Sequence, residues 1–469
     1  SSSSSSSSSA AATTTAATTP SSSSTPLYIE TPLIRADQLS DLLGVDVLLK
    51  LELLQPSGSF KMRGVSEYCR QAVANGAQGL VSSSGGNAGL ATAVCGRALR
   101  VPVVVVVPES TSERVRTRLR SLGATVEVHG TVWDQADAHA RSLVRASNGR
   151  LAAVHPFDHR LLHGGHATLV HELHAQLVAQ GYAEPAAILL SVGGGGLLVG
   201  VCEGLRTVGW DHVPVVAVET DGAASLRCAV QANRLCTLPG IRSRAKTLGA
   251  CTVAARALEE CQRRPVYSTL VSDHQALRGV LHLLETHCLL TELACGATVG
   301  AALRMLCDPV LATLLPSRAA SLALSSSSSP SSSSSSSLSS SSSPSSSSSS
   351  PPSSSTTTTS SVVEKPRSTR ASTATRSMAN LVRSPSRSVG TSTDPDHLVD
   401  PQQDELPEDM LATIPPLVVP APTQVPSPGK PCLVLVVCGG TGLSYEDVMA
   451  LKTELLGSVL SPSTTLPRT

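Results

Sequence analysis

Short runs of aliphatic and β-branched residues alternate along this chain with longer amphipathic segments. The runs have the length of strands and the segments have the length of helices, an order typical of βαβ units. This alternation predicts an α/β fold built on parallel or mixed sheets. The expected strands are 47–53, 79–82, 101–107, 186–190, 213–218 and 432–437.

Helix signals occur between these runs. Ser110 and Glu113 have the spacing of a capping box ahead of an apolar helical stripe, and Gly123 is placed to end that helix. A final helix is expected at 444–455.

Two low-complexity stretches interrupt the pattern in this chain of 469 residues. Residues 1–25 are rich in Ser, Ala and Thr, and residues 311–430 contain Ser and Pro tracts, then an Arg-rich part and an acidic part. Neither stretch has enough apolar surface to offset the entropy cost of ordering, so we expect both to be mostly disordered. Within the second, Ser384–Ser386 suits phosphorylation, and a solvated linker is the other interpretation.

Composition favours a small molecule as the partner. The 36 basic and 35 acidic residues nearly balance, so no charge excess points to nucleic acid or to an anionic membrane. No apolar run approaches the roughly 18–20 residues of a membrane span. The twelve cysteines contain no C-x-x-C pair, which argues against a zinc module and against a secreted disulfide scaffold. We therefore expect a cytoplasmic protein.

The segment Ser57–Gly64 places Lys61 after a short Gly/Ser loop, at the start of an expected helix. Partial burial near a helix N-terminus lowers the pKa of a lysine, and the unprotonated amine attacks carbonyl groups. The segment therefore suits a Schiff base. Taken alone, a solvated helix lysine is the ordinary interpretation.

Glycine-rich loops follow three of the expected strands, at 82–89, 191–198 and 436–442. The amides of such loops converge on an anion at the positive end of the next helix, and four consecutive glycines let a phosphate approach closely. No Gly-Lys-Ser/Thr follows them, which excludes a Walker P-loop. Cys438 would project at the carboxyl end of its strand, unless it is a small buried hydrophobe. A helix-opening lysine and these loops together describe a site for pyridoxal phosphate.

Five segments of this chain resemble the L-serine dehydratase/L-threonine deaminase family: Thr31–Leu33, Gln55–Lys61, Ser84–Gly89, Pro156–Asp158 and Ser191–Leu197. The resemblance covers roughly 26–307 and 431–456. It implies a fold-type II pyridoxal-phosphate enzyme of the tryptophan synthase beta superfamily, with the cofactor in a cleft between two α/β domains. The large domain would comprise 26–56, 159–310 and 431–457, and the small domain 57–158.

The family pattern also implies a role for each matching residue. Lys61 would be the catalytic residue and carry the Schiff base, Phe60 would pack on the cofactor ring, Asn87 would contact the ring hydroxyl, and Cys438 would face the ring nitrogen. The phosphate would bind Gly193, Gly194, Gly195 and Gly196. The substrate carboxylate would bind Ser84, Gly85, Gly86 and Asn87.

A monovalent cation, potassium, is implied by the same resemblance. Its oxygen ligands would come from Gly193, Glu219, Ala223, Ser225, Leu248 and Ala250. A helix cap or an ion pair is the other interpretation of Glu219. The histidines His163, His166, His171 and His174 are spaced to share a helix face, but no acidic or cysteine partners complete a metal site with them.

The activity expected from the resemblance is the dehydration and deamination of L-serine or L-threonine to pyruvate or 2-oxobutanoate plus ammonia, by a homodimeric ammonia-lyase. A thiol at Cys438 stabilises a protonated ring nitrogen less than an aspartate would, which suits β-elimination. The chain departs from the family pattern at Thr247, Leu293 and Gly442. The alternatives are a serine racemase-like or other fold-type II enzyme, and an inactive paralogue that serves as an interaction scaffold.

Overall fold

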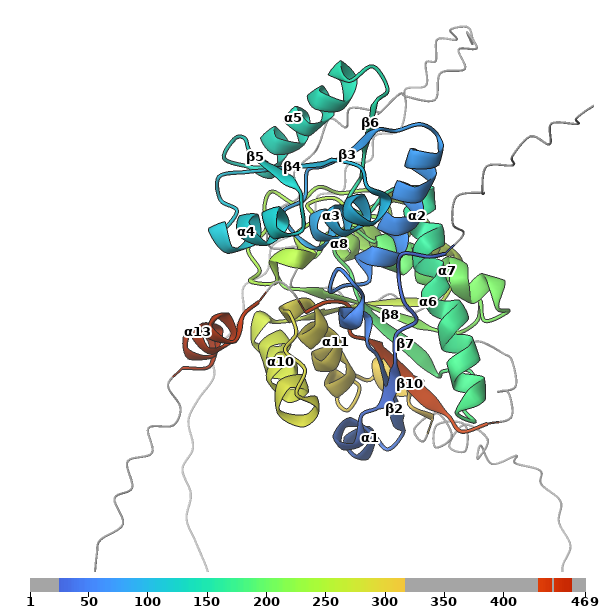
Figure 1. Cartoon of the computed structure of the whole chain (residues 1–469). Helices are drawn as coiled ribbons and strands as arrows, with labels where there is room; N and C mark the ends of the chain where they lie inside the picture. The colour runs from blue at the N-terminus through green and yellow to red at the C-terminus, as the bar shows by residue number, and fades with distance from the viewer. Residues whose placement is uncertain (1–24, 317–428, 441–442, 458–469) are drawn as a thin grey trace, which may run out of the picture. The chain divides into compact units, whose positions relative to one another are not determined.

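The computed structural model describes residues 25–316, 429–440 and 443–457 (Figure 1). Most of the two stretches expected to be disordered, the Ser384–Ser386 segment and Gly442 lie outside these residues. The described residues belong to one compact unit. None of the helices within these ranges is long and apolar enough to cross a membrane.

Six strands form a mixed sheet in the order β1-β2-β10-β7-β8-β9. β1 pairs antiparallel with β2, and the other neighbours pair in parallel. All residues of β2, β7, β8 and β10 are buried, as expected for strands that are covered on both faces. The strands are β1 (Leu33–Arg35), β2 (Asp46–Lys50), β7 (Ala187–Ser191), β8 (Val215–Thr220), β9 (Val266–Val271) and β10 (Cys432–Val436).

Four further strands form a second, parallel sheet in the order β5-β4-β3-β6. They are β3 (Gly79–Ser82), β4 (Val103–Val107), β5 (Thr125–Val128) and β6 (Leu151–Ala153). The helices between them are α3 (Asn87–Leu99), α4 (Glu113–Ser121) and α5 (Trp133–Ala146). This sheet lies within the span predicted as a small domain, and the domain boundaries themselves stay a prediction.

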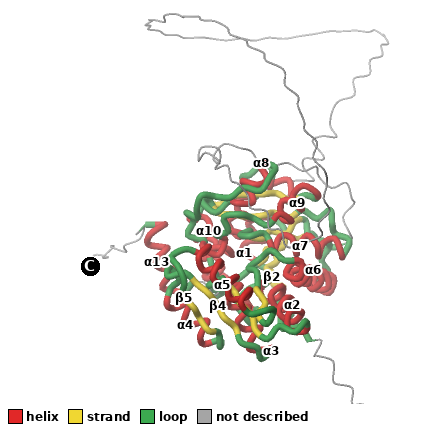
Figure 2. Tube along the Cα trace, turned by 90° about the horizontal axis from the view of Figure 1, so that it is seen from above, coloured by secondary structure: helices red, strands yellow, loops and turns green. Residues whose placement is uncertain are grey.

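The remaining helices surround the six-stranded sheet. α6 lies along one side of it, and α10 and α11 lie along the other, so that the strands are enclosed by helices (Figures 1 and 2). The helices are α1 (Asp37–Leu43), α2 (Lys61–Ala74), α6 (Arg160–Ala179), α7 (Gly196–Thr207), α8 (Ser225–Ala232), α9 (Ala255–Arg263), α10 (Asp273–His287), α11 (Leu293–Arg304) and α13 (Tyr445–Leu456), with 3₁₀ turns η1 (Glu52–Leu54), η2 (Lys246–Leu248) and η3 (Leu311–Leu314).

The last strand in the sequence occupies a central place in the sheet. β10 pairs with β2 from Cys432↔Asp46 to Val436↔Lys50, and on its other edge with β7. β10 lies far from η3 along the sequence, but the entropy cost of bringing two distant segments together grows only slowly with their separation. Burial of the whole strand between two neighbours therefore compensates for that cost.

The alternation of runs predicted the α/β class correctly, and each of the six expected strands exists. The strand at 79–82 has the predicted bounds, whereas β2 ends at Lys50 because the chain then turns into η1. The strands β1, β5, β6 and β9 were missed, and β1 and β6 have only three residues each. The final helix begins as expected, with a capping box on Ser444.

The capping box predicted at Ser110 is wrong. Residues 108–111 form a turn in which the Thr111 amide donates to the Pro108 carbonyl. The helix therefore starts later, with Ser112 as the N-cap and without a side-chain capping bond. Gly123 does follow the end of α4, with a positive φ of 92°.

A buried ion-pair network holds the start of α2. The Arg63 guanidinium donates to Glu52 Oε2 and Oε1 at 2.7 Å each, and to Glu172 Oε1 and Oε2 at 2.7 Å each. The Arg63 and Glu52 side chains are both fully buried. Lys50 joins the network through Glu172 at 2.9 Å. Burial lowers the pKa of Arg63, but the hydrogen bonds to Glu172 and Glu52 outweigh it, so the pKa lies above its ordinary value.

We expect Glu52→Ala to lower the free energy of unfolding by about 3–5 kcal/mol, because it leaves a buried guanidinium with less compensating charge. The control is Glu67→Ala on α2, which removes a partly exposed pair with Arg70 and is expected to cost less than about 1 kcal/mol. Urea unfolding of the three proteins measures the difference. Equal losses in the two variants would contradict a stabilising role for the network.

Candidate active site

Lys61 is the first residue of α2 and Phe60 is its N-cap. The Lys61 Nζ donates to the carbonyl oxygen of Pro156 at 2.6 Å. Burial lowers the pKa of Lys61 to about 8, although the Cys438 and Glu292 side chains oppose this shift. A larger share of the amine is therefore unprotonated near neutral pH than for an ordinary lysine, as a nucleophilic amine requires.

The four glycines at 193–196, called here the tetraglycine loop, connect β7 to α7 in a close turn over Phe157. A Cβ at Gly194 would lie 2.2 Å from Phe157 Cγ, and one at Gly196 would lie 2.5 Å from the Phe157 carbonyl oxygen. Within the part of the chain that the structure describes, the amides of Gly193, Gly194 and Gly195 donate to no backbone carbonyl. Because these amides precede the positive end of α7, the loop fits a phosphate group.

The serine loop, residues 82–86, connects β3 to α3 in a second close turn. A Cβ at Gly89 would lie 1.8 Å from the Ser84 carbonyl oxygen, so the loop packs directly on the first turn of α3. The Ser84 Oγ accepts a hydrogen bond from the Gly86 amide at 3.3 Å. Asn87, the first residue of the helix, donates from Nδ2 to Glu292 Oε1 at 2.9 Å. This hydrogen bond connects the serine loop to the N-terminus of α11.

Cys438 lies two residues beyond the end of β10 and is 2% exposed. Its Sγ is 3.3 Å from the Oγ of Ser191, the last residue of β7, and 3.5 Å from the Sγ of Cys295 in α11. Its carbonyl oxygen accepts a hydrogen bond from the Phe60 amide at 3.0 Å. The cysteine is thus buried at the carboxyl end of its strand and adjoins the start of α2.

The predicted site residues meet at one place although they come from distant segments. Lys61 lies within electrostatic reach of Cys438 and Glu292, and Glu292 holds Asn87. Pro156, which holds the Lys61 amine, precedes the Phe157 that packs on the tetraglycine loop. These contacts place an amine, an anion-binding loop, an amide and a thiol around a common centre. Their individual roles toward a ligand stay predictions.

Sequence reasoning missed Glu292 as a site residue. It is 3% exposed, and burial raises its pKa to about 7 although the Asn87 and Thr247 side chains lower it. Thr247, a departure from the family pattern, is therefore at the site. Leu293, another departure, is the first residue of α11, where proline and leucine are both well accommodated. The only sequence signal for Glu292 was its position next to this departure.

The predicted cation ligands lie after β7, at the end of β8, at the start of α8 and around η2. Glu219 is buried and accepts from the amides of Leu226 and Arg227 at 2.8 Å each, so it does cap α8. Burial raises its pKa to about 8. The neighbouring Ser225 Oγ is buried and has no hydrogen-bond partner among the described residues. A Cβ at Gly193 would lie 3.1 Å from the Cα of Leu248, so these two ligands adjoin.

Ala223 and Ala250 lie on short turns of the same region. Ala223 forms a bridge with Thr220, and the Ala250 amide donates to the Leu248 carbonyl at 2.9 Å. The four helix histidines do not converge: His163 bonds to Phe157, His171 bonds to Thr207, and the ring of His174 packs on Trp210. Over the described ranges, no group of three or more His, Cys, Asp or Glu is arranged to hold a metal ion.

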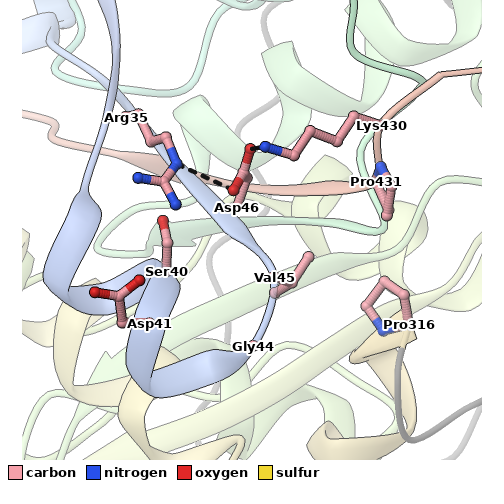
Figure 3. Close-up of a pocket in the computed structure, with 9 residues that line it drawn as sticks. All are labelled: Arg35, Ser40, Asp41, Gly44, Val45, Asp46, Pro316, Lys430 and Pro431. Atoms are coloured by element: carbon pink, nitrogen blue, oxygen red, sulfur yellow. Dashed lines mark hydrogen bonds and ion pairs between the residues drawn. The ribbon is translucent and has the colours of Figure 1, made fainter.

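A cavity of about 580 Å³ lies elsewhere, at the amino ends of β2 and β10 (Figure 3). Asp46 at its wall is already bonded to Arg35, Lys430 and Tyr182. Open parallel sheets bind ligands at the carboxyl ends of their strands, and Ser191 and Cys438 lie at that edge. We therefore assign the candidate active site to the region around Lys61.

The chain is similar to known proteins. Residues 24–311 match the family model described as "Pyridoxal-phosphate dependent enzyme". The human protein named "Serine dehydratase-like" is 48% identical over 276 residues, which are 59% of this chain and 82% of the relative. The human "L-serine dehydratase/L-threonine deaminase" is 43% identical over 276 residues, which are 59% of this chain and 83% of that protein.

A solved structure is similar as well. The fungal L-serine ammonia-lyase from Rhizomucor miehei is 38% identical, with a TM-score of 0.58 over 62% of this chain and 91% of that protein. The family match ends before β10, so Cys438 is placed at the site by the sheet order and by its contacts with Ser191, Cys295 and Phe60.

We expect Gly194→Ala to weaken pyridoxal phosphate binding by about 10-fold or more, because overpacking against Phe157 costs about 1–3 kcal/mol. The control is Gly164→Ala, where an added Cβ meets nothing within 4 Å and the site is an exposed helix position. A titration of the apoprotein with the cofactor, followed by absorbance, measures both. Unchanged affinity in Gly194→Ala would show that the loop does not hold the phosphate.

Proposed function

Because this chain belongs to the family of pyridoxal-phosphate dependent enzymes, we propose that it is an ammonia-lyase that converts L-serine or L-threonine to pyruvate or 2-oxobutanoate plus ammonia. The names of its relatives support this substrate class. The observation that carries the proposal is the helix-opening Lys61, whose pKa is lowered to about 8, beside the tetraglycine loop and Cys438.

The residues present fit the cofactor. The amides of the tetraglycine loop suit its phosphate, and no side chain at Gly194 or Gly196 obstructs the turn. The Lys61 amine suits its aldehyde. When bound, pyridoxal phosphate withdraws electrons from the substrate, which makes the Cα proton acidic and allows the β-hydroxyl group to leave.

Lys61 performs two tasks in this proposal. Its Nζ would hold the cofactor at the aldehyde group, and, when freed by the substrate amine, the same nitrogen would be placed to remove the Cα proton. The lowered pKa helps both tasks, because an amine can attack a carbonyl or accept a proton only when it is unprotonated. The Pro156 carbonyl, 2.6 Å from Nζ, orients the free amine.

The other site residues bind and orient. The serine loop, with Ser84, Gly85, Gly86 and Asn87, would bind the substrate carboxylate at the positive end of α3. Phe60 is partly buried and would pack on the cofactor ring. Cys438 would face the ring nitrogen as a weak hydrogen-bond partner, which leaves less positive charge on the ring and favours elimination.

We expect Lys61→Ala to lose the visible imine absorbance and to lower 2-oxo acid production by about 10²–10⁴-fold, since both the anchor and the base at Cα are removed. Lys452→Ala, on the partly exposed surface of α13, is the control and should keep both signals. Product analysis from L-serine and L-threonine completes the test. A colourless wild type that takes up no cofactor would refute the proposal, and D-serine without pyruvate would favour the racemase alternative.

Potassium is a further part of the proposal. The Glu219 carboxylate, the Ser225 hydroxyl and the carbonyls of Gly193, Ala223, Leu248 and Ala250 are oxygen donors, which a hard cation prefers. The buried Ser225 Oγ without a partner supports a ligand there. A bound cation would also offset the burial of the Glu219 charge.

The raised pKa of Glu219, about 8, predicts a pH dependence of this cation site. Below that pH a proton occupies the carboxylate and must be displaced, so the half-saturating potassium concentration should fall by about 5-fold as the pH rises from 7 to 8. Potassium titrations of enzyme activity at several pH values measure this. Ser225→Ala should raise the half-saturating concentration, and a titration that is the same at every pH would contradict the assignment.

A homodimer and a cytoplasmic location are proposed as well. The dimer rests on the family resemblance. The location is supported by the twelve cysteines, all of which are unpaired, as is typical of a reducing compartment.

A further inference from the structure

Glu292 occupies an unusual position for a carboxylate. It is the N-cap residue of α11, yet its side chain makes no capping bond to that helix. Instead its Oε1 accepts a hydrogen bond from Asn87 Nδ2 at 2.9 Å, across 205 residues of sequence. Burial of a carboxylate is costly unless the group is hydrogen-bonded, and the Asn87 amide supplies such a bond. The Glu292 side chain therefore bonds to Asn87 and does not cap α11.

The backbone at Gly439 packs against the hydrogen-bonded side chains of Glu292 and Asn87. A Cβ at Gly439 would lie 2.8 Å from Glu292 Oε1 and 3.2 Å from Asn87 Nδ2, so only a glycine fits over the two side chains. Gly439 directly follows Cys438, and it forms a bridge with Ser59. The hydrogen bond thus lies at the point where the start of α2, the start of α3 and the end of β10 meet.

A carboxylate removes an ambiguity that an asparagine otherwise has. The two ends of a primary amide have nearly the same shape, but one end donates and the other accepts. An ionised carboxylate only accepts, so its bond to Asn87 specifies the end of the amide that carries the nitrogen. Burial raises the pKa of Glu292 to about 7, whereas the Asn87 and Thr247 side chains and then Lys61 on α2 favour the ionised form. Cys295 is the titratable neighbour on α11.

We propose that Glu292 is a positioning residue that acts through Asn87, fixing its amide so that the nitrogen end is presented to the ring hydroxyl of the cofactor. This inference rests on the proposed function, in which Asn87 contacts that hydroxyl. Glu292 itself touches neither cofactor nor substrate in this arrangement. Its effect on cofactor binding must therefore disappear when Asn87 is absent.

A double-mutant cycle on the full-length protein tests this dependence. The proteins are the wild type, Asn87→Ala, Glu292→Ala and the double variant, and the measured quantity is the apparent dissociation constant of pyridoxal phosphate for the apoprotein. We expect Glu292→Ala to weaken binding by about 10-fold or more, as loss of a supporting hydrogen bond typically does behind metal ligands. Asn87→Ala should weaken it at least as much.

The decisive comparison is the double variant. If Glu292 acts through Asn87, the double variant binds the cofactor no more weakly than Asn87→Ala alone, because nothing is left to position. Losses that multiply would overturn the proposal, since Glu292 would then act on the cofactor by another route. Normal cofactor affinity in Glu292→Ala would overturn it as well.

Two controls keep the test interpretable. Glu184 precedes β7, and its partly buried carboxylate bonds to His212. Glu184→Ala should leave the cofactor affinity unchanged. If Glu292→Ala does not fold, Glu292→Leu keeps more of the volume, has no acceptor for Asn87 and replaces it in the cycle, with the same expected dependence on Asn87. A wild type that binds no cofactor would refute the proposed function, whereas multiplying losses in a cofactor-binding protein would refute only the role of Glu292.

Discussion

The buried guanidinium of Arg63 is the interaction on which the placement of the reactive amine depends. Arg63 is two residues beyond Lys61 on α2, and successive helix residues are separated by about 100°. The two side chains therefore point to nearly opposite sides of the helix. Two carboxylates, Glu52 and Glu172, hold Arg63 with four bonds of 2.7 Å, and this orients Lys61 toward the strand ends.

The same network explains why the amine is held at a partly buried position, where its hydrogen bond goes to the uncharged carbonyl of Pro156. Burial of an isolated lysine is unfavourable, and the fold accepts that cost because α2 is fixed from its other side. The result is a pKa lowered to about 8, which a flexible surface lysine would not have. The constraint in the core thus produces the chemical property that the proposed reaction requires.

The site is completed by groups from both sheets. The serine loop and Asn87 follow β3 of the four-stranded sheet. The tetraglycine loop and Cys438 follow β7 and β10 of the six-stranded sheet, and Glu292 directly precedes α11. Hydrogen bonds such as Asn87 to Glu292 and Phe60 to Cys438 connect these groups. The position of each group therefore depends on the packing of the others.

The sequence by itself determined the α/β class, the helix that begins at Lys61 and the glycine turns at 193–196, because these depend on local periodicity and on steric limits near each residue. Short strands such as β1 and β6 escaped prediction because three residues carry too little pattern. Tertiary structure alone decided that β10 lies between β2 and β7, and that Glu292 meets Asn87. Those contacts follow from strand order and packing between distant segments, which no local pattern encodes.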